Sequence, residues 1–269
     1  MPRSVDVSYV VSPTNTAVAA AAAELFSSTA AAAVKASGVA RIAISGGSTP
    51  KAMFALLADP SKPYLAATPW QSLELFWVDE RCVPPTDPDS NYRMTNEAML
   101  SHVPLPAERV HRMEGELDPV VAAARYESRI RNTFKLEGAQ TPTFDLILLG
   151  MGDDGHTASL FPHTEALNEM GLIVTANHVP QKDTWRITLT WPVINQARQV
   201  AFLIEGAGKA EVLKDVLLGP YDPETKPSQL IRPSNGRLTF LLDRASAAKL
   251  PEPAAVAGSE TATGTLELR

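Results

Sequence analysis

The chain has 269 residues, of which 45% are hydrophobic and 20% charged, a composition typical of a globular protein that buries a sizeable core. Its net charge of −6 argues against a nucleic acid or an anionic membrane as partner, because both attract basic surfaces. The single cysteine, Cys82, excludes a disulfide within the chain and fits a reducing compartment, so we expect a cytoplasmic protein.

In chain order, short apolar runs alternate with segments of helical periodicity. We predict strands at residues 6–11, 40–45, 73–78, 144–149, 172–176, 185–190, 200–204 and 238–242, and helices at residues 16–36, 50–58, 92–102, 120–136, 208–218 and 244–250. Several strands are apolar throughout, as in residues 146–149, which suits strands buried on both faces. The alternation predicts an α/β fold with a mainly parallel sheet covered by helices on both faces.

Three segments depart from this pattern. The alanine-rich run at residues 17–33 resembles a membrane span, but Glu24 and several hydroxyl side chains interrupt it, so we interpret it as a soluble helix. Residues 59–71 carry three prolines, which predicts an irregular surface excursion. Residues 251–269 show no periodicity, so we expect a flexible tail after a single domain formed by residues 1–250.

Ligands of parallel sheets bind beyond the carboxyl ends of the strands, which makes the strand-to-helix loops the candidate sites. The first such loop consists of Ser45, Gly46, Gly47, Ser48 and Thr49. Its glycines let the backbone approach an anion, and its hydroxyl groups and the following helix N-terminus supply donors. A tight turn with a helix cap is the plainer interpretation, but the position between strand and helix favours phosphate binding.

The second loop places Asp79, Glu80 and Arg81 directly after a predicted strand and continues to Asn91. Arg81 has the geometry to bind an oxyanion through two parallel hydrogen bonds, and we take Asp79 and Asn91 as candidates for substrate binding. A solvated turn whose charges pair with one another explains the same residues equally well.

The third loop, residues 149–162, contains Asp154 and His156 on a glycine-rich backbone. A histidine can take a proton from water near neutral pH, and a nearby carboxylate can orient its ring, so the pair predicts general-base catalysis. A structural histidine is the alternative. The glycines also match a dinucleotide fingerprint, which we reject because two aspartates would face the pyrophosphate and a proline soon ends the next helix. His163 lies seven residues further on, which is not a metal-ligand spacing, so we expect no metal and no cofactor.

Two basic residues complete the candidate set. Lys209 opens a predicted helix after the strand at residues 200–204, and Arg186 begins the strand at residues 185–190. Each is suited to contact an anion, although a surface charge is the simpler interpretation of either residue alone.

Together, residues 45–50, 77–94, 145–162, 186–195 and 206–213 resemble the 6-phosphogluconolactonase family, within the superfamily that also holds glucosamine-6-phosphate deaminases. The run from Gly152 to Pro162 is the most specific of these motifs. The resemblance implies a Rossmann-like fold of the NagB/RpiA/CoA transferase type and the hydrolysis of 6-phospho-D-glucono-1,5-lactone in the oxidative pentose phosphate pathway. It further implies that His156 is the base, Asp154 its supporting carboxylate and Arg81 a contact to substrate or developing charge. The phosphate would be held by residues 45–49, Arg186 and Lys209.

Two other functions are compatible with the same residues. An isomerase or deaminase of amino-sugar phosphates would use the same phosphate loop and Asp79 as a proton shuttle. A catalytically inert sugar-phosphate-binding protein would keep the pocket without the reaction. Arg81 and the residues that follow His156 favour the lactonase. The partner we expect is therefore a phosphorylated sugar lactone, and a monomer is plausible although the sequence does not determine the oligomeric state.

Overall fold

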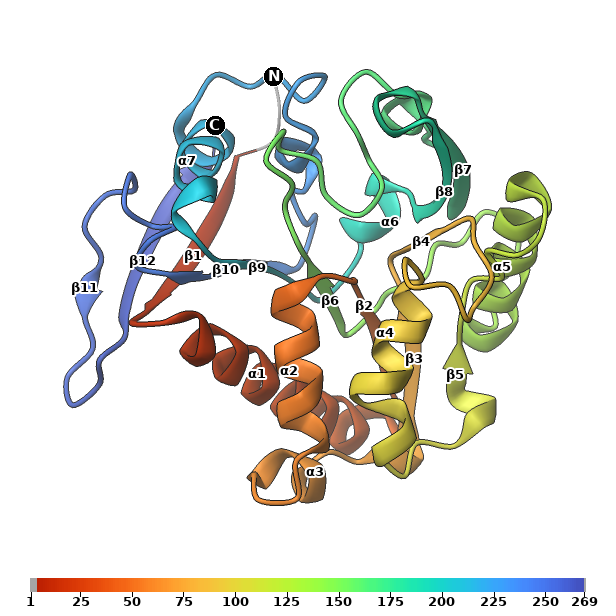
Figure 1. Cartoon of the computed structure of the whole chain (residues 1–269), viewed down its shortest axis with the longest axis horizontal. Coiled ribbons are helices and arrows are strands. Elements are labelled where there is room, and N and C mark those ends of the chain that lie inside the picture. Colours follow the sequence, from red (N-terminus) through yellow and green to blue (C-terminus); the bar gives the residue numbers. More distant parts are fainter. Residues whose placement is uncertain (1–3, 269) are drawn as a thin grey trace.

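The computed structural model describes residues 4–268, which form a nine-stranded sheet and a second, three-stranded sheet (Figure 1). The order of the large sheet is β11-β12-β1-β10-β9-β6-β2-β3-β5, and its strands from β1 to β5 in that order run parallel. The small antiparallel sheet has the order β4-β8-β7. The strands are β1 (Val5–Ser12), β2 (Ala40–Ile44), β3 (Leu73–Trp77), β4 (Asp79–Arg81), β5 (Val110–His111), β6 (Leu146–Leu149), β7 (Val174–Val179), β8 (Thr184–Leu189), β9 (Gln199–Ile204), β10 (Arg237–Asp243), β11 (Ala254–Ala255) and β12 (Ala262–Leu268).

Helices cover both faces of the large sheet, as the apolar strands predict (Figure 1). They are α1 (Asn15–Ser37), α2 (Ser48–Ala58), α3 (Pro63–Ala67), α4 (Asn91–Ala98), α5 (Pro119–Phe134), α6 (Trp191–Ile194) and α7 (Ala210–Leu218). In β6, Leu146 and Leu148 join the core beneath α1 and α2, whereas Ile147 and Leu149 join the core beneath α5, α6 and α7. Successive side chains of a strand point to opposite faces, so a strand that is apolar throughout serves two cores.

Helix α1 is the element of the described chain that is long and apolar enough to cross a membrane. Its buried residues Val18, Ala22, Phe26 and Ala30 recur every four positions and therefore form one stripe, which packs in the core with α2 and the sheet. Glu24 lies on the exposed side. One face of α1 is therefore packed in the core, which agrees with the interpretation of this segment in the sequence analysis.

All eight predicted strands and five of the six predicted helices are present, with ends that differ by a few residues. The exception is the helix predicted at residues 244–250, where the chain forms successive turns instead. The carboxylate of Asp243 accepts hydrogen bonds from the backbone N–H groups of Ser246 and Gly206. Asp243 thus fixes this segment as a turn at the end of β10, and the helix prediction is wrong there.

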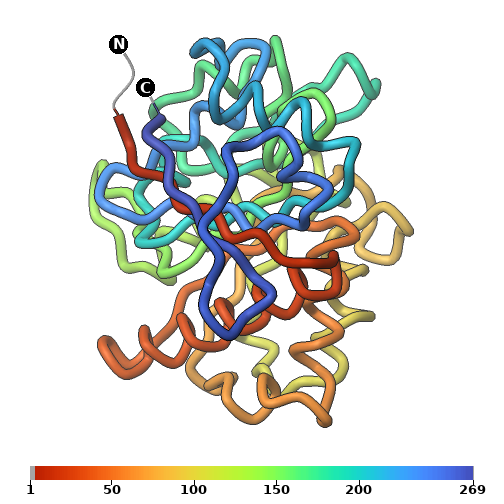
Figure 2. The backbone as a smooth tube through the Cα atoms, turned by 90° about the vertical axis from the view of Figure 1, so that its left-hand side faces the viewer, coloured from red at the N-terminus to blue at the C-terminus, as the bar shows by residue number. Residues whose placement is uncertain are grey.

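The C-terminal segment also differs from the prediction. Residues 262–268, expected to belong to a flexible tail, form β12 and pair antiparallel with β1 along its length. Figure 2 shows this last strand beside the first one, although they come from opposite ends of the chain. Tyr9 explains part of the fit, because its ring lies so close to Gly264 that a Cβ atom there would be 2.1 Å from it.

The excursion at residues 59–71 is exposed over much of its length, as predicted, but it is not irregular throughout. It contains the short helix α3 and the buried Trp70, whose indole N–H donates to the carbonyl of Leu65 at 2.8 Å. The ring of Trp70 lies 6.3 Å from that of Phe26, at the middle of α1, so the excursion packs against the central part of this helix.

The topology of the large sheet determines where a ligand can bind. β2 and β6 are neighbours, but the chain continues from β2 to β3 and β5 on one side and from β6 to β9 and β10 on the other. Such a reversal leaves a crevice at the carboxyl ends of the two strands, which is the usual ligand position in open α/β sheets. The loops singled out in the sequence follow β2, β3, β6 and β9, which are adjacent strands.

Candidate active site

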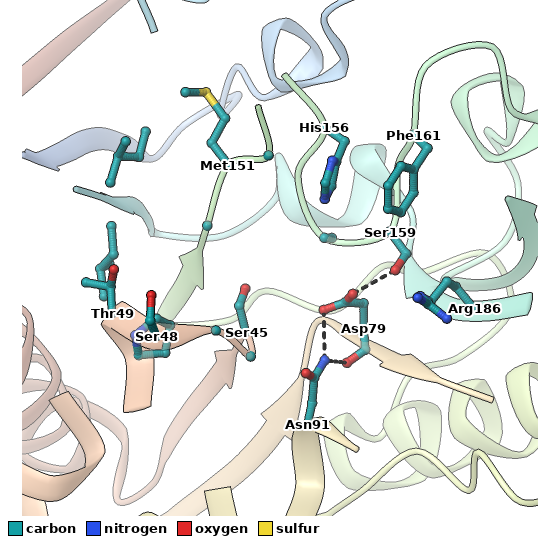
Figure 3. Close-up of a pocket in the computed structure, with 18 of the residues that line it drawn as sticks. Ser45, Ser48, Thr49, Asp79, Asn91, Met151, His156, Ser159, Phe161 and Arg186 are labelled. Atoms are coloured by element: carbon teal, nitrogen blue, oxygen red, sulfur yellow. Dashed lines mark hydrogen bonds between the residues drawn. The ribbon is translucent and has the colours of Figure 1, made fainter. Parts of the chain in front are cut away.

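A pocket of about 360 Å³ lies at the carboxyl ends of these four strands (Figure 3). It brings together nearly all the residues predicted from the sequence to form the site, which are Ser45, Gly46, Gly47, Ser48, Thr49, Asp79, Arg81, Asn91, His156, Arg186 and Lys209. The remaining predicted residue, Asp154, lies behind His156 rather than on the pocket wall. Residues separated by more than 150 positions in the chain therefore share one cavity.

The loop after β6 holds the histidine in a defined orientation. The carboxylate Oδ1 of Asp154 lies 2.5 Å from Nδ1 of His156 and also accepts the backbone N–H of His156 at 3.1 Å. The N–H of Gly152 donates to the carbonyl of His156 at 2.8 Å, which closes the loop. On its other side the imidazole stacks on the ring of Phe161, with 3.9 Å between the ring centres. With Nδ1 occupied, Nε2 is the nitrogen left to exchange a proton with a ligand.

The electrostatics of Asp154 reflect this contact. Partial burial by itself would raise the pKa of its carboxyl, but the hydrogen bond to His156 and the attraction of that ring outweigh burial and lower the pKa from 3.8 to about 2. Asp154 is therefore a carboxylate at neutral pH, available to accept the Nδ1–H of the imidazole.

Gly152 is required for this arrangement. A Cβ atom on Gly152 would lie 2.1 Å from Nδ1 of His156 and 2.6 Å from Oδ1 of Asp154, which are impossible contacts. The backbone of Gly152 does not have a positive φ, so the requirement comes from space and not from conformation. The absence of a side chain at Gly152 thus leaves room for the histidine–aspartate pair.

The loop after β2 supplies free donors at the start of α2. Gly47 is the N-cap of this helix at a φ of 121°, and no side chain caps the helix. Ser45 uses its hydroxyl within the fold, donating to the carbonyl of Leu148 at 2.8 Å. Ser48 stays exposed and Thr49 is buried, and both line the pocket. An uncapped helix N-terminus next to a cavity is suited to bind an anion.

Asp79 lies in a buried hydrogen-bond network on the pocket floor (Figure 3). Ser159 donates to its Oδ2 at 2.7 Å, and the amide of Asn91 donates to its carbonyl at 3.0 Å and to Oδ1 at 3.5 Å. Gly46 packs directly against Asn91, since a Cβ atom there would lie 1.8 Å from the amide oxygen. The hydrogen bond to Oδ1 of Asp79 is longer than the one to Oδ2. Oδ1 is therefore the carboxylate oxygen better able to accept a further hydrogen bond from a ligand.

The small sheet brings two arginines together. Arg81 of β4 and Arg186 of β8 are directly paired in the antiparallel register. Burial lowers the pKa of Arg186, and the charge of Arg81 lowers it further. Within residues 4–268 neither guanidinium has a carboxylate within ion-pair distance; Arg81 instead donates to the backbone carbonyl of Asp89. Like charges opposite one another destabilise a sheet, so this pair favours a bound anion.

Lys209 lies on the β9 side of the pocket. It follows Gly206, whose φ is 94°, and its ammonium group lies 2.5 Å from Oδ1 of Asp153. Part of its charge is therefore neutralised before any ligand binds, although Asp153 is largely exposed.

Among the lining residues that were not predicted from the sequence, four carry a polar, charged or aromatic side chain: Ser159, Phe161, Lys182 and Glu205. The first two belong to the loop already singled out, but sequence alone does not show which of its side chains face inward. Lys182 comes from the turn between β7 and β8, and Glu205 lies near Ser48, with 3.5 Å between its Oε1 and the hydroxyl. Neither sits in a recognisable motif, so only the folded chain identifies them.

Within the described residues, no group of three or more histidine, cysteine, aspartate or glutamate side chains is placed to hold a metal ion. The expectation that the site works without metal or organic cofactor stays a prediction.

Comparisons with known proteins agree on one family. The profile of glucosamine-6-phosphate isomerases/6-phosphogluconolactonase matches residues 13–240. A 6-phosphogluconolactonase of Nostoc sp. is 41% identical over 242 residues, which cover 89% of this chain and 97% of that protein. One from Haemophilus influenzae is 38% identical over 205 residues, 76% of this chain and 85% of that protein.

The solved structures give the same result. The 6-phosphogluconolactonase from Trypanosoma cruzi matches with a TM-score of 0.79 at 31% identity, covering 91% of this chain and 97% of that one. A monomeric glucosamine-6-phosphate deaminase matches with a TM-score of 0.72 at 20% identity, covering 90% and 99%. At that identity the deaminase shows a shared fold only.

Proposed function

The chain belongs to the family of glucosamine-6-phosphate isomerases and 6-phosphogluconolactonases, and we propose that it hydrolyses 6-phospho-D-glucono-1,5-lactone to 6-phospho-D-gluconate. This lactonase reaction is the second step of the oxidative pentose phosphate pathway. The observation that carries the proposal is the His156–Asp154 pair. Its histidine faces the same pocket as an uncapped helix N-terminus and two arginines, Arg81 and Arg186, that form no ion pair within residues 4–268.

A lactone is a cyclic ester, so its hydrolysis requires an activated water and stabilisation of a tetrahedral oxyanion. His156 takes a proton from water through Nε2 while the oxygen of that water bonds to the lactone carbon. Asp154 holds Nδ1–H and stabilises the imidazolium that forms. The intermediate then collapses, the bond from carbon to the ring oxygen breaks, and the imidazolium returns its proton to that oxygen. Arg81 contacts the negative charge that develops on the carbonyl oxygen.

The phosphate provides the remaining binding energy. Residues 45–49 offer backbone N–H groups and hydroxyl donors, and Arg186 and Lys209 add positive charge from other walls of the pocket. Asp79 and Asn91 contact the hydroxyl groups of the sugar. A phosphate held away from the reacting carbon aligns that carbon with the water, so it contributes to turnover as well as to affinity.

One observation favours a second candidate. Asp79 is a buried carboxylate in the pocket, as a proton shuttle of an amino-sugar phosphate isomerase or deaminase would be. Its Oδ2 is already bound to Ser159. Release of ammonia from glucosamine 6-phosphate at a rate comparable to lactone hydrolysis would favour this second function. Binding of 6-phosphogluconate without any catalysis would instead indicate an inert binding protein.

The direct test follows fresh 6-phosphogluconolactone by NMR with and without the protein. We expect hydrolysis well above the spontaneous rate, unchanged after exhaustive chelation and without added NAD(P). A rate equal to the spontaneous one would overturn the lactonase. Loss of activity on chelation, restored by a divalent ion, would overturn the mechanism through His156.

We further propose that the enzyme is cytoplasmic and that its single domain includes the C-terminal strand; its oligomeric state is open, and a monomer is compatible with the sequence. One sheet contains β1 and β12 from opposite ends of the chain, and the single thiol of Cys82 is half-buried. Light scattering on the purified protein tests the oligomeric state, and cell fractionation tests the location.

A further inference from the structure

Glu80 is a buried carboxylate beside the active site that the mechanism above does not use. It lies between Asp79 and Arg81 in β4, and it is not among the residues that line the pocket. Successive side chains of a strand alternate in direction, so Glu80 points away from the cavity that its two neighbours face. Only 2% of its surface is exposed, which makes an ionisable group costly unless donors surround it.

Four donors do surround it. Oε1 accepts the backbone N–H groups of Arg81 and Asn91, each at 2.8 Å. Oε2 accepts the backbone N–H of Tyr92 at 2.8 Å and the hydroxyl of Ser90 at 3.1 Å. This Glu80 network therefore joins β4 to the first turn of α4, two segments that a loop of nine residues separates.

Both the backbone and the side chain of Arg81 depend on this network. Its backbone N–H is bound directly to Glu80, and its guanidinium donates to the carbonyl of Asp89, the residue before Ser90. Without the carboxylate, the strand and the segment from Asp89 to Asn91 lose their common anchor. The guanidinium would then lose the carbonyl that orients it toward the pocket.

We infer that Glu80 is a positioning residue for Arg81: it holds both the backbone and the guanidinium partner of the arginine where the lactone oxyanion forms. The inference rests on the proposed hydrolysis. Its alternative is that Glu80 only caps α4 and contributes to stability alone.

Glu80→Gln is the informative substitution because it keeps the volume and replaces one oxygen by an NH₂ group. Each carboxylate oxygen faces two donors, so the amide must turn its NH₂ toward donors in either orientation. A displacement of about 1 Å at a catalytic group costs on the order of 10²-fold, and we expect a loss of that order in kcat/KM.

Glu127→Gln is the matched control. Glu127 of α5 also accepts backbone N–H groups, those of Ile173 and Val174, but it lies outside the pocket. We expect Glu127→Gln to lower the thermal midpoint and to leave kcat/KM unchanged.

A double-mutant cycle with Arg81→Ala separates positioning from stability. If Glu80 acts through Arg81, Glu80→Gln costs about 10²-fold in the wild-type background and less than about threefold when Arg81 is already alanine. The cycle is read on kcat/KM and, by calorimetry, on the Kd of 6-phosphogluconate. Equal losses in both backgrounds, or no loss in either, would overturn the inference.

If Glu80→Gln does not fold, Ser90→Ala replaces it in the same cycle. This variant removes one of the four donors, and we expect a loss of about 3- to 10-fold that disappears in the Arg81→Ala background. A loss that persists there would overturn the inference. A wild-type protein without lactonase activity would contradict the proposed function instead, so the two failures are distinguishable.

Discussion

Gly152→Ala adds a single methyl group to the loop that carries the catalytic histidine. Because the backbone of Gly152 lies outside the left-handed region, alanine is conformationally acceptable there. The methyl group would nevertheless lie 2.1 Å from Nδ1 and 2.2 Å from Cε1 of His156, and 2.6 Å from Oδ1 of Asp154. The atoms nearest to the added methyl group therefore all belong to the histidine–aspartate pair.

The magnitude follows from the distances. Ordinary contacts of a Cβ atom begin near 3.4 Å, so the imidazole must move by roughly 1 Å or more, away from Asp154 or out of its stacking on Phe161. Displacement of a catalytic group by about 1 Å costs on the order of 10²-fold in rate, or about 2.7 kcal/mol of transition-state stabilisation. The histidine is partly exposed and can rotate, so we expect the thermal midpoint to change little.

The assay is the hydrolysis of fresh 6-phosphogluconolactone, followed by NMR and corrected for the spontaneous rate. Gly208→Ala is the matched control, because a methyl group there meets no atom within 4 Å and its φ is not positive. We expect normal kcat/KM in Gly208→Ala and a loss of about 10²-fold in Gly152→Ala. If Gly152→Ala stays within threefold of the wild type, the close packing of His156 on Asp154 is not what catalysis requires.

Four further predictions concern the same site and the sheet that carries it. His156→Asn should lose about 10²- to 10⁴-fold in kcat and the rise of kcat/KM with pH; an unchanged pH profile would point to Asp79 as the base. The lowered pKa of Asp154, about 2 against 3.8, means that its contribution to stability is present above pH 3.8 and is lost as the pH falls toward about 2. Asp154→Asn should therefore remove a step from acid unfolding and lower kcat/KM at neutral pH, because the imidazole loses the carboxylate that orients it. Lys209→Ala should mainly raise KM, and unphosphorylated gluconolactone should lose both kcat and affinity; equal efficiency on the two lactones would contradict phosphate anchoring. Deletion of residues 254–269 should expose the edge of β1 and lower the thermal midpoint without changing kcat/KM, whereas an unaltered midpoint would mean that β12 adds no stability.

The sequence by itself was sufficient for the local features of this protein. Apolar runs such as residues 146–149 and the periodicity of α1 depend on neighbouring side chains, so strands and helices could be predicted from them. The chemistry of the loops is local as well, because Asp154 and His156 are two residues apart and meet within one turn. Eleven of the twelve predicted site residues consequently line the pocket, and the twelfth supports His156.

Only the tertiary structure decided which distant segments meet. Arg81 and Arg186 face each other because β4 pairs with β8. The two residues are more than 100 positions apart, and nothing in the sequence of either strand predicts that the two strands pair. The strand β12 also depends on a distant segment. Its residues show no periodicity and were predicted to be a flexible tail, but they form a strand because they pair with the edge of β1. Residues 244–250 have a helical pattern but form turns, because the carboxylate of Asp243 accepts hydrogen bonds from the backbone N–H groups of Gly206 and Ser246. Hydrogen bonds between remote backbone segments leave no periodicity in the chain, and so this part of the fold and of the site is determined by the packing alone.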